Sequence, residues 1–175
     1  KPRRALVHVY RFGRRPDLKK VFTRPTEGDE MTILYDVSLS MRDEPITEAA
    51  ERMIKALFAD AGVEAQQALE RYVPDLKPFS WKTSIFHAIK SVHEDGGRKI
   101  FVITDGADND SEYENVDLSK WADQLEGVSI VYVVIAEKDD EKVEAFVKRV
   151  CTLPSTMAYV VDTAAHIDTN VCKAI

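Results

Sequence analysis

Cysteine is scarce in this sequence: Cys151 and Cys172 are the only two among 175 residues, and no Cys-x-x-Cys pair occurs. Their spacing matches no cysteine-ligated metal site, which excludes a zinc centre built on cysteine. Both lie near the C-terminus and would pair if their elements touch. We interpret them instead as two free thiols, which favours an intracellular protein while leaving its location unassigned.

Long apolar runs are also missing. None approaches the roughly 20 residues that a membrane-spanning helix needs, so we expect no membrane segment in this chain. No secretory apolar segment opens the sequence. Because the chain begins at Lys1 rather than at Met, we expect a fragment of a larger protein, and the missing signals then say little about location.

The signatures of common enzymes are absent as well. The sequence has no Gly-x-x-x-x-Gly-Lys phosphate-binding loop, and its histidines form neither His-Glu-x-x-His nor a defensible Ser-His-Asp set. A phosphatase of the haloacid dehalogenase type needs a second acid two residues after its strand-end aspartate. In this chain, Asp36 is followed at that position by Ser38. We therefore expect a binding protein that is not an enzyme.

Charge is distributed unevenly along the chain, whose formal net charge is −6 at pH 7. Residues 1–24 contain nine Lys or Arg and one acidic residue, Asp17, whereas the remainder is acidic. A basic arm of this kind is typical of surfaces that bind nucleic acid or acidic partners. The alternative, which we favour, is that this segment pairs with the acidic body or faces water.

Hydrophobic periodicity predicts a single α/β domain over residues 1–175. Two segments around turn-forming residues predict a basic N-terminal β-hairpin within 1–24, with strands at 5–12 and 18–23. From residue 31 onward, short apolar runs alternate with amphipathic segments. The predicted strands are 31–35, 100–104, 128–136 and 158–161, and the predicted helices are 46–61, 83–93, 118–125, 140–151 and 164–175. Residues 63–73 fit a helical period better than alternation.

The alternation of strands and helices over 31–175 predicts the core architecture. Continuous apolar runs such as 128–136 are typical of strands that are covered on both faces. Such strands joined by helices favour a Rossmann-like three-layer sandwich, with a mostly parallel central sheet between helices on both faces.

Three side chains with oxygen donors follow the first buried strand. Asp36, Ser38 and Ser40 form an Asp-x-Ser-x-Ser motif at its C-terminal end, where ligands bind in open α/β sheets. Carboxylate and hydroxyl oxygens suit Mg²⁺ or Ca²⁺ and suit zinc poorly. Two later segments add Thr83, at the start of a predicted helix, and Asp105, after the strand 100–104.

Each of these residues also has an ordinary structural interpretation. Asp36 and Asp105 are suited to capping the helices that follow them, and Ser38 and Ser40 to bonding nearby backbone groups. Thr83 is suited to be the N-cap of its own helix. Their coincidence in three loops near one predicted sheet edge favours a cation site over these separate roles.

The order of the motifs resembles the von Willebrand factor A family and its metal-ion-dependent adhesion site. The shared features are Asp-x-Ser-x-Ser, then Thr-x-Ile-x-x-Ala-Ile from Thr83, then an apolar strand that ends in Thr-Asp-Gly at Asp105. The resemblance covers residues 31–175. It implies an α/β sandwich that binds a divalent cation at one edge of its sheet.

The resemblance also implies a role for each matching residue. Ser38, Ser40 and Thr83 would bind Mg²⁺, or Mn²⁺ or Ca²⁺ in its place, directly through their hydroxyls, while Asp36 and Asp105 would hold its waters and supply charge. An open position on the cation would accept an exposed Asp or Glu of a protein partner. The residues expected at the rim of this site are Leu39, Lys82 and Asp108.

Three departures from the family pattern bear on these expectations. Lys82 stands where a glycine usually precedes the threonine, so its ammonium either competes with the metal or helps to draw an acidic ligand. Leu39 replaces a small residue and makes the rim more apolar. The family normally places an antiparallel edge hairpin before the threonine, and residues 62–82 contain no such pair. We therefore predict that the N-terminal hairpin takes that edge, with 5–12 hydrogen-bonded into the main sheet.

The leading hypothesis is a protein-interaction module, within a complex or a multidomain protein, that binds an acidic side chain through a divalent cation. A scaffold domain with a metal site left idle by Lys82 is one alternative. Another is association with RNA or other nucleic acid, as in the Ro-type RNA-binding proteins that contain a similar domain. The residues concerned would be Arg11, Arg14, Arg15, Lys19 and Lys20.

Overall fold

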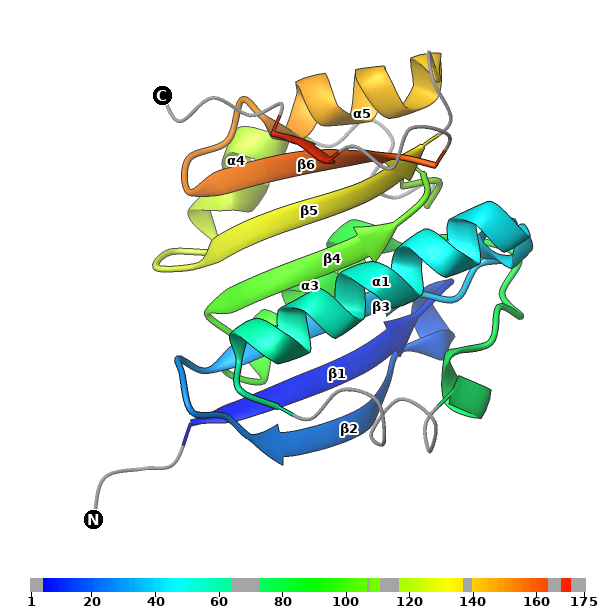
Figure 1. Cartoon of the computed structure of the whole chain (residues 1–175). Coiled ribbons are helices and arrows are strands. Elements are labelled where there is room, and N and C mark those ends of the chain that lie inside the picture. Colours follow the sequence, from blue (N-terminus) through cyan, green and yellow to red (C-terminus); the bar gives the residue numbers. More distant parts are fainter. Residues whose placement is uncertain are drawn as a thin grey trace.

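The computed structural model describes residues 5–63, 73–106, 108–110, 117–136, 140–163 and 168–170. Within them, a seven-stranded sheet in the order β2-β1-β3-β4-β5-β6-β7 forms the middle layer (Figure 1). The strands are β1 (Leu6–Phe12), β2 (Lys19–Pro25), β3 (Met31–Asp36), β4 (Lys99–Thr104), β5 (Ser129–Ala136), β6 (Thr156–Asp162) and β7 (Asp168–Asn170).

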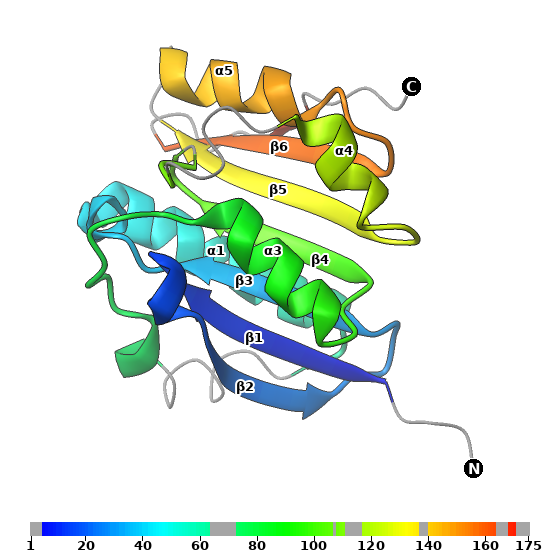
Figure 2. The same ribbon diagram turned by 180° about the vertical axis from the view of Figure 1, so that it is seen from behind.

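Helices cover both faces of this sheet. They are α1 (Glu44–Asp60), α3 (Ile85–Glu94), α4 (Leu118–Asp123) and α5 (Glu141–Val150). α1 lies on one face, and α3 and α4 lie on the other (Figures 1 and 2). The α5 helix packs on the same side as α3, because the Phe146 ring contacts Phe86 of α3 and Tyr132 of β5. The predicted three-layer α/β sandwich is therefore confirmed.

The five inner strands β1, β3, β4, β5 and β6 run parallel, and the two edge strands β2 and β7 run antiparallel to their neighbours. β1 pairs with β3 in parallel register, with Val9 opposite Ile33. This confirms the prediction that the N-terminal hairpin joins the main sheet at its edge. The reason is burial: Val7, Val9 and Phe12 are at most 1% exposed, so β1 needs cover on both faces.

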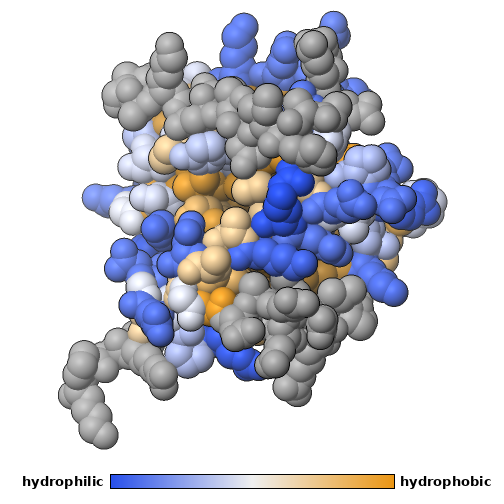
Figure 3. All heavy atoms as spheres, in the orientation of Figure 1, coloured by the Kyte–Doolittle hydropathy of each residue, from blue (hydrophilic) through white to orange (hydrophobic). Residues whose placement is uncertain are grey.

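Successive residues of the inner strands supply two separate cores. In β3, Ile33 packs on the α1 side and Leu34 on the α3 side, and Ile103 and Val102 of β4 divide in the same way. This follows from the alternation of side chains along a strand. Figure 3 shows apolar side chains in the middle of the face that bears α1, bordered by hydrophilic ones. The apolar runs of the sequence thus reflect cover on both faces.

Most predicted elements agree with the structure to within two residues, but three expectations need correction. Thr83 is not the N-cap of its helix, because α3 begins at Ile85 with Ser84 as its N-cap. The closing helix predicted over 164–175 is wrong at Asp168–Asn170, which forms β7 and pairs with β6. That pairing gives backbone partners to a strand that would otherwise end the sheet. The rest of 164–175, and residues 64–72 of the predicted helical segment, lie outside the described residues.

The third correction concerns cysteine. Cys151, which follows α5, is disulfide-bonded, so the expectation of two free thiols is wrong for this residue. The only other cysteine in the sequence is Cys172, which lies outside the described residues. The preference for an intracellular location rested on those free thiols and loses that support. Among the described helices, none combines the length and the apolar character needed to cross a lipid bilayer.

Candidate cation site

Asp36 lies at the C-terminal end of β3, fully buried, and both of its carboxylate oxygens accept hydrogen bonds. The backbone N–H of Ser38 donates to Oδ1 at 2.7 Å, and the hydroxyl of Thr104 donates to Oδ2 at 2.7 Å. Thr104 ends β4, the strand beside β3. The two groups meet because the carboxyl ends of parallel strands share one edge of the sheet.

A chain of side chains runs outward from Asp36 at this edge. The Ser38 and Ser40 hydroxyls are 3.1 Å apart, and the Ser40 hydroxyl donates to Oδ1 of Asp105 at 2.9 Å. Ser38 is 4% exposed, whereas Ser40 is exposed and Asp105 is half-buried. The structure therefore brings four of the five predicted cation ligands into one hydrogen-bonded group that leads from the core to the surface.

Thr83, the fifth predicted ligand, lies in the segment that precedes α3 and is 5% exposed. Its backbone N–H donates to Oδ1 of Asn109 at 2.8 Å, and its carbonyl accepts from the Asn109 N–H at 3.1 Å. Within the described part of the chain, no hydrogen bond joins the Thr83 hydroxyl to the other four side chains. Its segment nevertheless reaches the group, because Ser80 pairs with Ser38 in an isolated parallel bridge.

The two carboxylates resist ionisation in this setting. Burial, and then the charge of Asp105, raise the pKa of Asp36 to about 7, against smaller opposing effects of the hydrogen bonds from Thr104 and Ser38. Burial also raises the pKa of Asp105, although its hydrogen bond from Ser40 opposes this. A buried pair of like charges is costly, and either a proton or a cation relieves that cost.

The donor set of the group is chemically specific. Its four side chains offer two carboxylates and two hydroxyls, all hard oxygen donors of the kind that Mg²⁺ and Ca²⁺ prefer. Among the residues that the structure describes, no three or more His, Cys, Asp or Glu side chains gather where they could hold a metal ion. A cation at this group would therefore need hydroxyl oxygens, and waters, in addition to the two carboxylates.

Of the three predicted rim residues, Leu39 is half-buried and Lys82 is exposed. Asp108 is half-buried, and its carboxylate is hydrogen-bonded within the protein: Oδ2 accepts from the Phe86 N–H at 2.9 Å, in the first turn of α3, and Oδ1 accepts from the Asp110 N–H at 2.8 Å. Burial raises the pKa of Asp108. Asp110, two residues further on, is 7% exposed.

The turn of the N-terminal hairpin is hydrogen-bonded to the segment 80–84, which lies next to the site. The Ser80 hydroxyl accepts from the Arg14 N–H at 2.9 Å and donates to Oδ2 of Asp17 at 2.7 Å. The carbonyl of Gly13 accepts from the Ser84 N–H at 2.8 Å. A Cβ atom at Gly13 would overlap Cβ and Oγ of Ser80, so glycine is needed for this close approach. Sequence reasoning missed these contacts, because no local pattern links the turn to Ser80.

The basic residues of the hairpin are largely engaged by the protein itself. Arg11 lies 3.8 Å from an Asp75 oxygen, Arg14 lies 3.6 Å from an Asp17 oxygen, and Arg15 lies 2.8 Å from an Asp110 oxygen. The ammonium of Lys20 lies 5.5 Å from the centre of the Tyr10 ring, and Lys19 is exposed. The interpretation that this arm pairs with the acidic body thus holds for Arg11 and Arg15, whereas Arg14 pairs with Asp17 of the hairpin itself.

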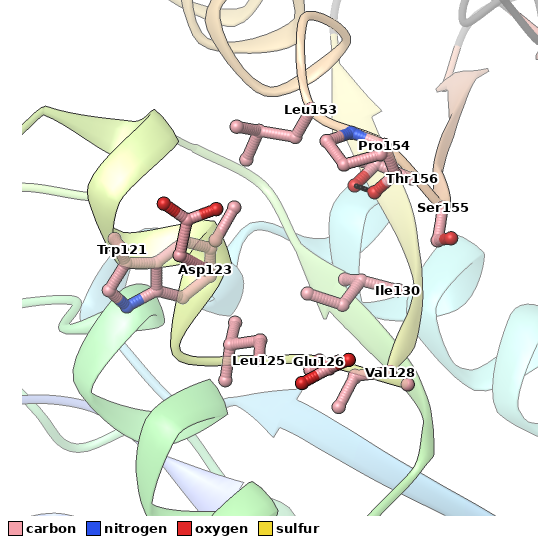
Figure 4. Close-up of a pocket in the computed structure, with 12 residues that line it drawn as sticks. Trp121, Asp123, Leu125, Glu126, Val128, Ile130, Leu153, Pro154, Ser155 and Thr156 are labelled. Carbon is pink, nitrogen blue, oxygen red and sulfur yellow. Dashed lines mark hydrogen bonds between the residues drawn. The ribbon is translucent and has the colours of Figure 1, made fainter.

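A cavity of about 420 Å³ lies elsewhere, at the opposite edge of the sheet (Figure 4). It opens between α4 and the N-terminal ends of β5 and β6, where Trp121, Leu125 and Leu153 border it. The candidate cation site occupies the C-terminal ends of β3 and β4. The two places are therefore separated by the length of the strands, and the cavity is no part of the site.

Comparisons with known proteins assign neither a family nor a function to this chain. No family model, no curated protein and no solved structure matches this chain. The fold itself defines a Rossmann-like α/β sandwich with an oxygen-rich group at the C-terminal edge of its sheet.

Proposed function

We propose that this domain is a protein-interaction module that binds an acidic side chain of a partner through a divalent cation. The observation behind the proposal is the hydrogen-bonded group Asp36–Ser38–Ser40–Asp105, which ends at the surface on Ser40. The motifs that resemble a metal-ion-dependent adhesion site supply these same residues. On this proposal the domain is similar to the von Willebrand factor A family, with its edge hairpin moved to the N-terminus.

The roles of the residues follow from their hydrogen bonds. Both Asp36 oxygens already accept protein donors, so Asp36 would act through its charge and through bridging water rather than as a direct ligand. Ser38 and Ser40 would bind the cation with their hydroxyl oxygens, and Thr83 would do so from the neighbouring segment. Such neutral ligands leave positive charge on Mg²⁺, which a partner carboxylate would complement. The proposal includes no catalytic step.

Thermal unfolding tests the cation directly. A ligand that binds only the folded state raises its stability by mass action. At about ten times its dissociation constant, Mg²⁺ should add about 1.4 kcal/mol and raise the melting temperature by about 3–6 °C relative to EDTA. The same measurement on Asp36→Ala should give no shift. Asp123→Asn, which removes an exposed carboxylate near the opposite edge of the sheet, should respond like the wild type.

Failure of this test has a definite meaning. If millimolar Mg²⁺, Mn²⁺ and Ca²⁺ all leave the wild-type midpoint unchanged, the cation mechanism is excluded and the scaffold alternative with an idle site takes its place. If Asp36→Ala responds as strongly as the wild type, the cation binds elsewhere. The fold is unaffected by either outcome.

Binding of nucleic acid by the hairpin is the less supported alternative. Affinity for nucleic acid comes mainly from basic side chains that neutralise phosphates, and Arg11, Arg14 and Arg15 already face Asp75, Asp17 and Asp110. Charge reversal at Lys19 and Lys20 would abolish such binding. Its affinity would fall steeply as the salt concentration rises, and EDTA would not change it. Binding of an acidic protein partner should show the opposite response to EDTA.

A further inference from the structure

Two exposed aromatic side chains lie beside the candidate cation site. Trp81 is 80% exposed and Phe79 is 44% exposed, and the only other large hydrophobic side chain exposed in the described ranges is Met157 of β6. Ser80, between the two, is 2% exposed. The segment thus alternates exposed, buried, exposed, which directs Phe79 and Trp81 to the same outward side. We call these two residues the aromatic rim.

The backbone of the aromatic rim is tied to the Asp-x-Ser-x-Ser loop. The N–H groups of Phe79 and Ser80 both donate to the Val37 carbonyl, at 2.8 and 3.0 Å, and the Leu39 N–H donates to the Ser80 carbonyl at 2.8 Å. Paired backbones of this kind lie about 4.8 Å apart. The indole of Trp81 therefore extends from a position adjacent to the loop that holds Ser38 and Ser40.

Phe79 is held by a contact within the molecule of a kind that Trp81 does not have among the described residues. The Arg11 guanidinium lies 5.0 Å from the centre of the Phe79 ring and also donates to the Asp75 carbonyl at 3.2 Å. Within the described part of the chain, no aromatic ring or cation lies against the Trp81 ring. A tryptophan on a fixed backbone, with most of its surface in water, is suited to binding a partner, because it offers large apolar area at little entropic cost.

The charges around the aromatic rim favour a partner with an isolated acidic group. Lys82 follows Trp81 and is exposed, and it forms no ion pair among the described residues. Arg14 and Arg15, from the hairpin turn behind Ser80, are paired with Asp17 and Asp110. A phosphate backbone needs several unpaired basic side chains, whereas one carboxylate needs only Lys82 and the proposed cation.

We infer that the aromatic rim binds an apolar side chain of the partner segment whose acidic residue occupies the cation site. The occupant is a protein segment in which an Asp or Glu stands within about four residues of an aromatic or aliphatic side chain, since extended chain spans about 3.3 Å per residue. This inference rests on the proposed function. The cation selects the acid, and Trp81 selects the residue near it.

Short peptides with random residues on both sides of a fixed central Asp test the inference. The immobilised domain selects binders from this library, and from a matched library with central Asn, in millimolar Mg²⁺ and in EDTA. We expect Mg²⁺-dependent retention of Asp peptides that are enriched in Trp, Phe, Tyr or Leu near the Asp. One enriched peptide should bind Trp81→Ser roughly tenfold or more weakly than the wild type. It should also shift the emission of Trp81 to the blue.

Matched variants separate binding from folding. Trp81→Ser should keep the wild-type melting temperature, because the side chain is 80% exposed. Met157→Ser removes the third exposed apolar side chain. Met157 is the second residue of β6 and lies at the opposite end of the strands, so this variant should bind the peptide like the wild type. Trp81→Phe should recover part of the lost affinity.

Each contrary outcome is distinguishable. Mg²⁺-dependent Asp peptides without apolar enrichment, or with equal affinity for Trp81→Ser, would overturn the role of the aromatic rim and leave the cation site standing. No preference for Asp over Asn, or no effect of EDTA, would overturn the proposed function and this inference together. Binding of a single-stranded oligonucleotide in EDTA, weakened by salt and by Trp81→Ser, would assign Trp81 to base stacking instead.

Discussion

Arg15 in the hairpin turn and Asp110 after β4 form a double hydrogen bond, with Nε 2.8 Å from Oδ2 and Nη2 2.9 Å from Oδ1. The same carboxylate accepts from the Ser84 hydroxyl, the N-cap residue of α3, at 3.0 Å. Three segments far apart in the sequence thus meet on one buried carboxylate. The basic N-terminal segment is part of the fold at the edge where the candidate site lies.

Replacing Arg15 by alanine should destabilise the protein. The substitution leaves the Asp110 carboxylate buried without its paired donors, which we expect to cost about 1–3 kcal/mol because the arginine itself is partly exposed. Urea unfolding gives the measurement. Arg14→Ala is the control: its side chain is 58% exposed and its backbone bond to Ser80 persists, so it should change stability by less than about 0.5 kcal/mol. Equal losses for both variants would contradict this account.

The effect of Mg²⁺ on stability should depend on pH. The pKa of Asp36 is raised to about 7 in the folded protein, mainly by burial, against about 3.9 in an unfolded chain. The stability that its proton provides is fully present below about pH 4 and is lost as pH rises through about 7. Mg²⁺ favours the ionised form, so its stabilisation should grow between about pH 5.5 and about pH 8.

Melting curves with Mg²⁺ and with EDTA at both pH values measure this dependence. Asp36→Asn, which keeps the shape of the side chain and cannot ionise, should lose the pH-dependent part of the Mg²⁺ effect. A Mg²⁺ shift that is larger at the lower pH would show that Asp36 is not coupled to the cation.

Gly13→Ala should disturb the packing of the hairpin turn against Ser80. Its Cβ would overlap the side chain of Ser80, which forces the hairpin turn and the segment before Trp81 apart. We expect a cost of about 1–3 kcal/mol in the free energy of unfolding, as for other overpacked positions. Gly28→Ala is the matched control, since its nearest atom, Oγ1 of Thr26, would lie 3.9 Å away. A tolerated Gly13→Ala would mean that the turn moves freely relative to Ser80.

Phe12→Ala tests whether β1 is a structural strand rather than a separable arm. Phe12 is 1% exposed in the core on the α3 side, and its carbonyl accepts from the Val37 N–H at 2.8 Å. Loss of the ring should cost about 3–5 kcal/mol in chemical unfolding. Lys19→Ala, an exposed change in the same hairpin, should be nearly neutral. A detachable arm would instead tolerate both substitutions.

Much of the fold was predictable because its signals are local. The runs that became β3, β4 and β5 are continuous apolar segments, since both faces of these strands are buried. The α5 helix has an apolar face and begins after Asp140, whose carboxylate accepts from the N–H groups of Lys142 and Val143. Strand-end Asp36 and Asp105 were likewise visible, because β3 and β4 each end in an oxygen-bearing loop.

Features that depend on contacts between distant segments could not be predicted from local sequence patterns. The prediction of Asp108 as a rim residue gave no sign that its carboxylate accepts from the Phe86 N–H. Asp168–Asn170 fitted a helix until β6 offered it backbone partners. Cys151 looked free from its spacing and is disulfide-bonded.

The sequence by itself determined which segments are buried strands and helices, and which oxygen-bearing residues end them, because hydrophobic periodicity and strand-end position are properties of neighbouring residues. Only the tertiary structure decided that the basic turn supports Ser80, that Arg15 meets Asp110, and that Trp81 stands exposed beside the Asp-x-Ser-x-Ser loop. The contacts of the turn with Ser80 and with Asp110 join residues 66 and 95 positions apart, and no local pattern specifies packing over such separations.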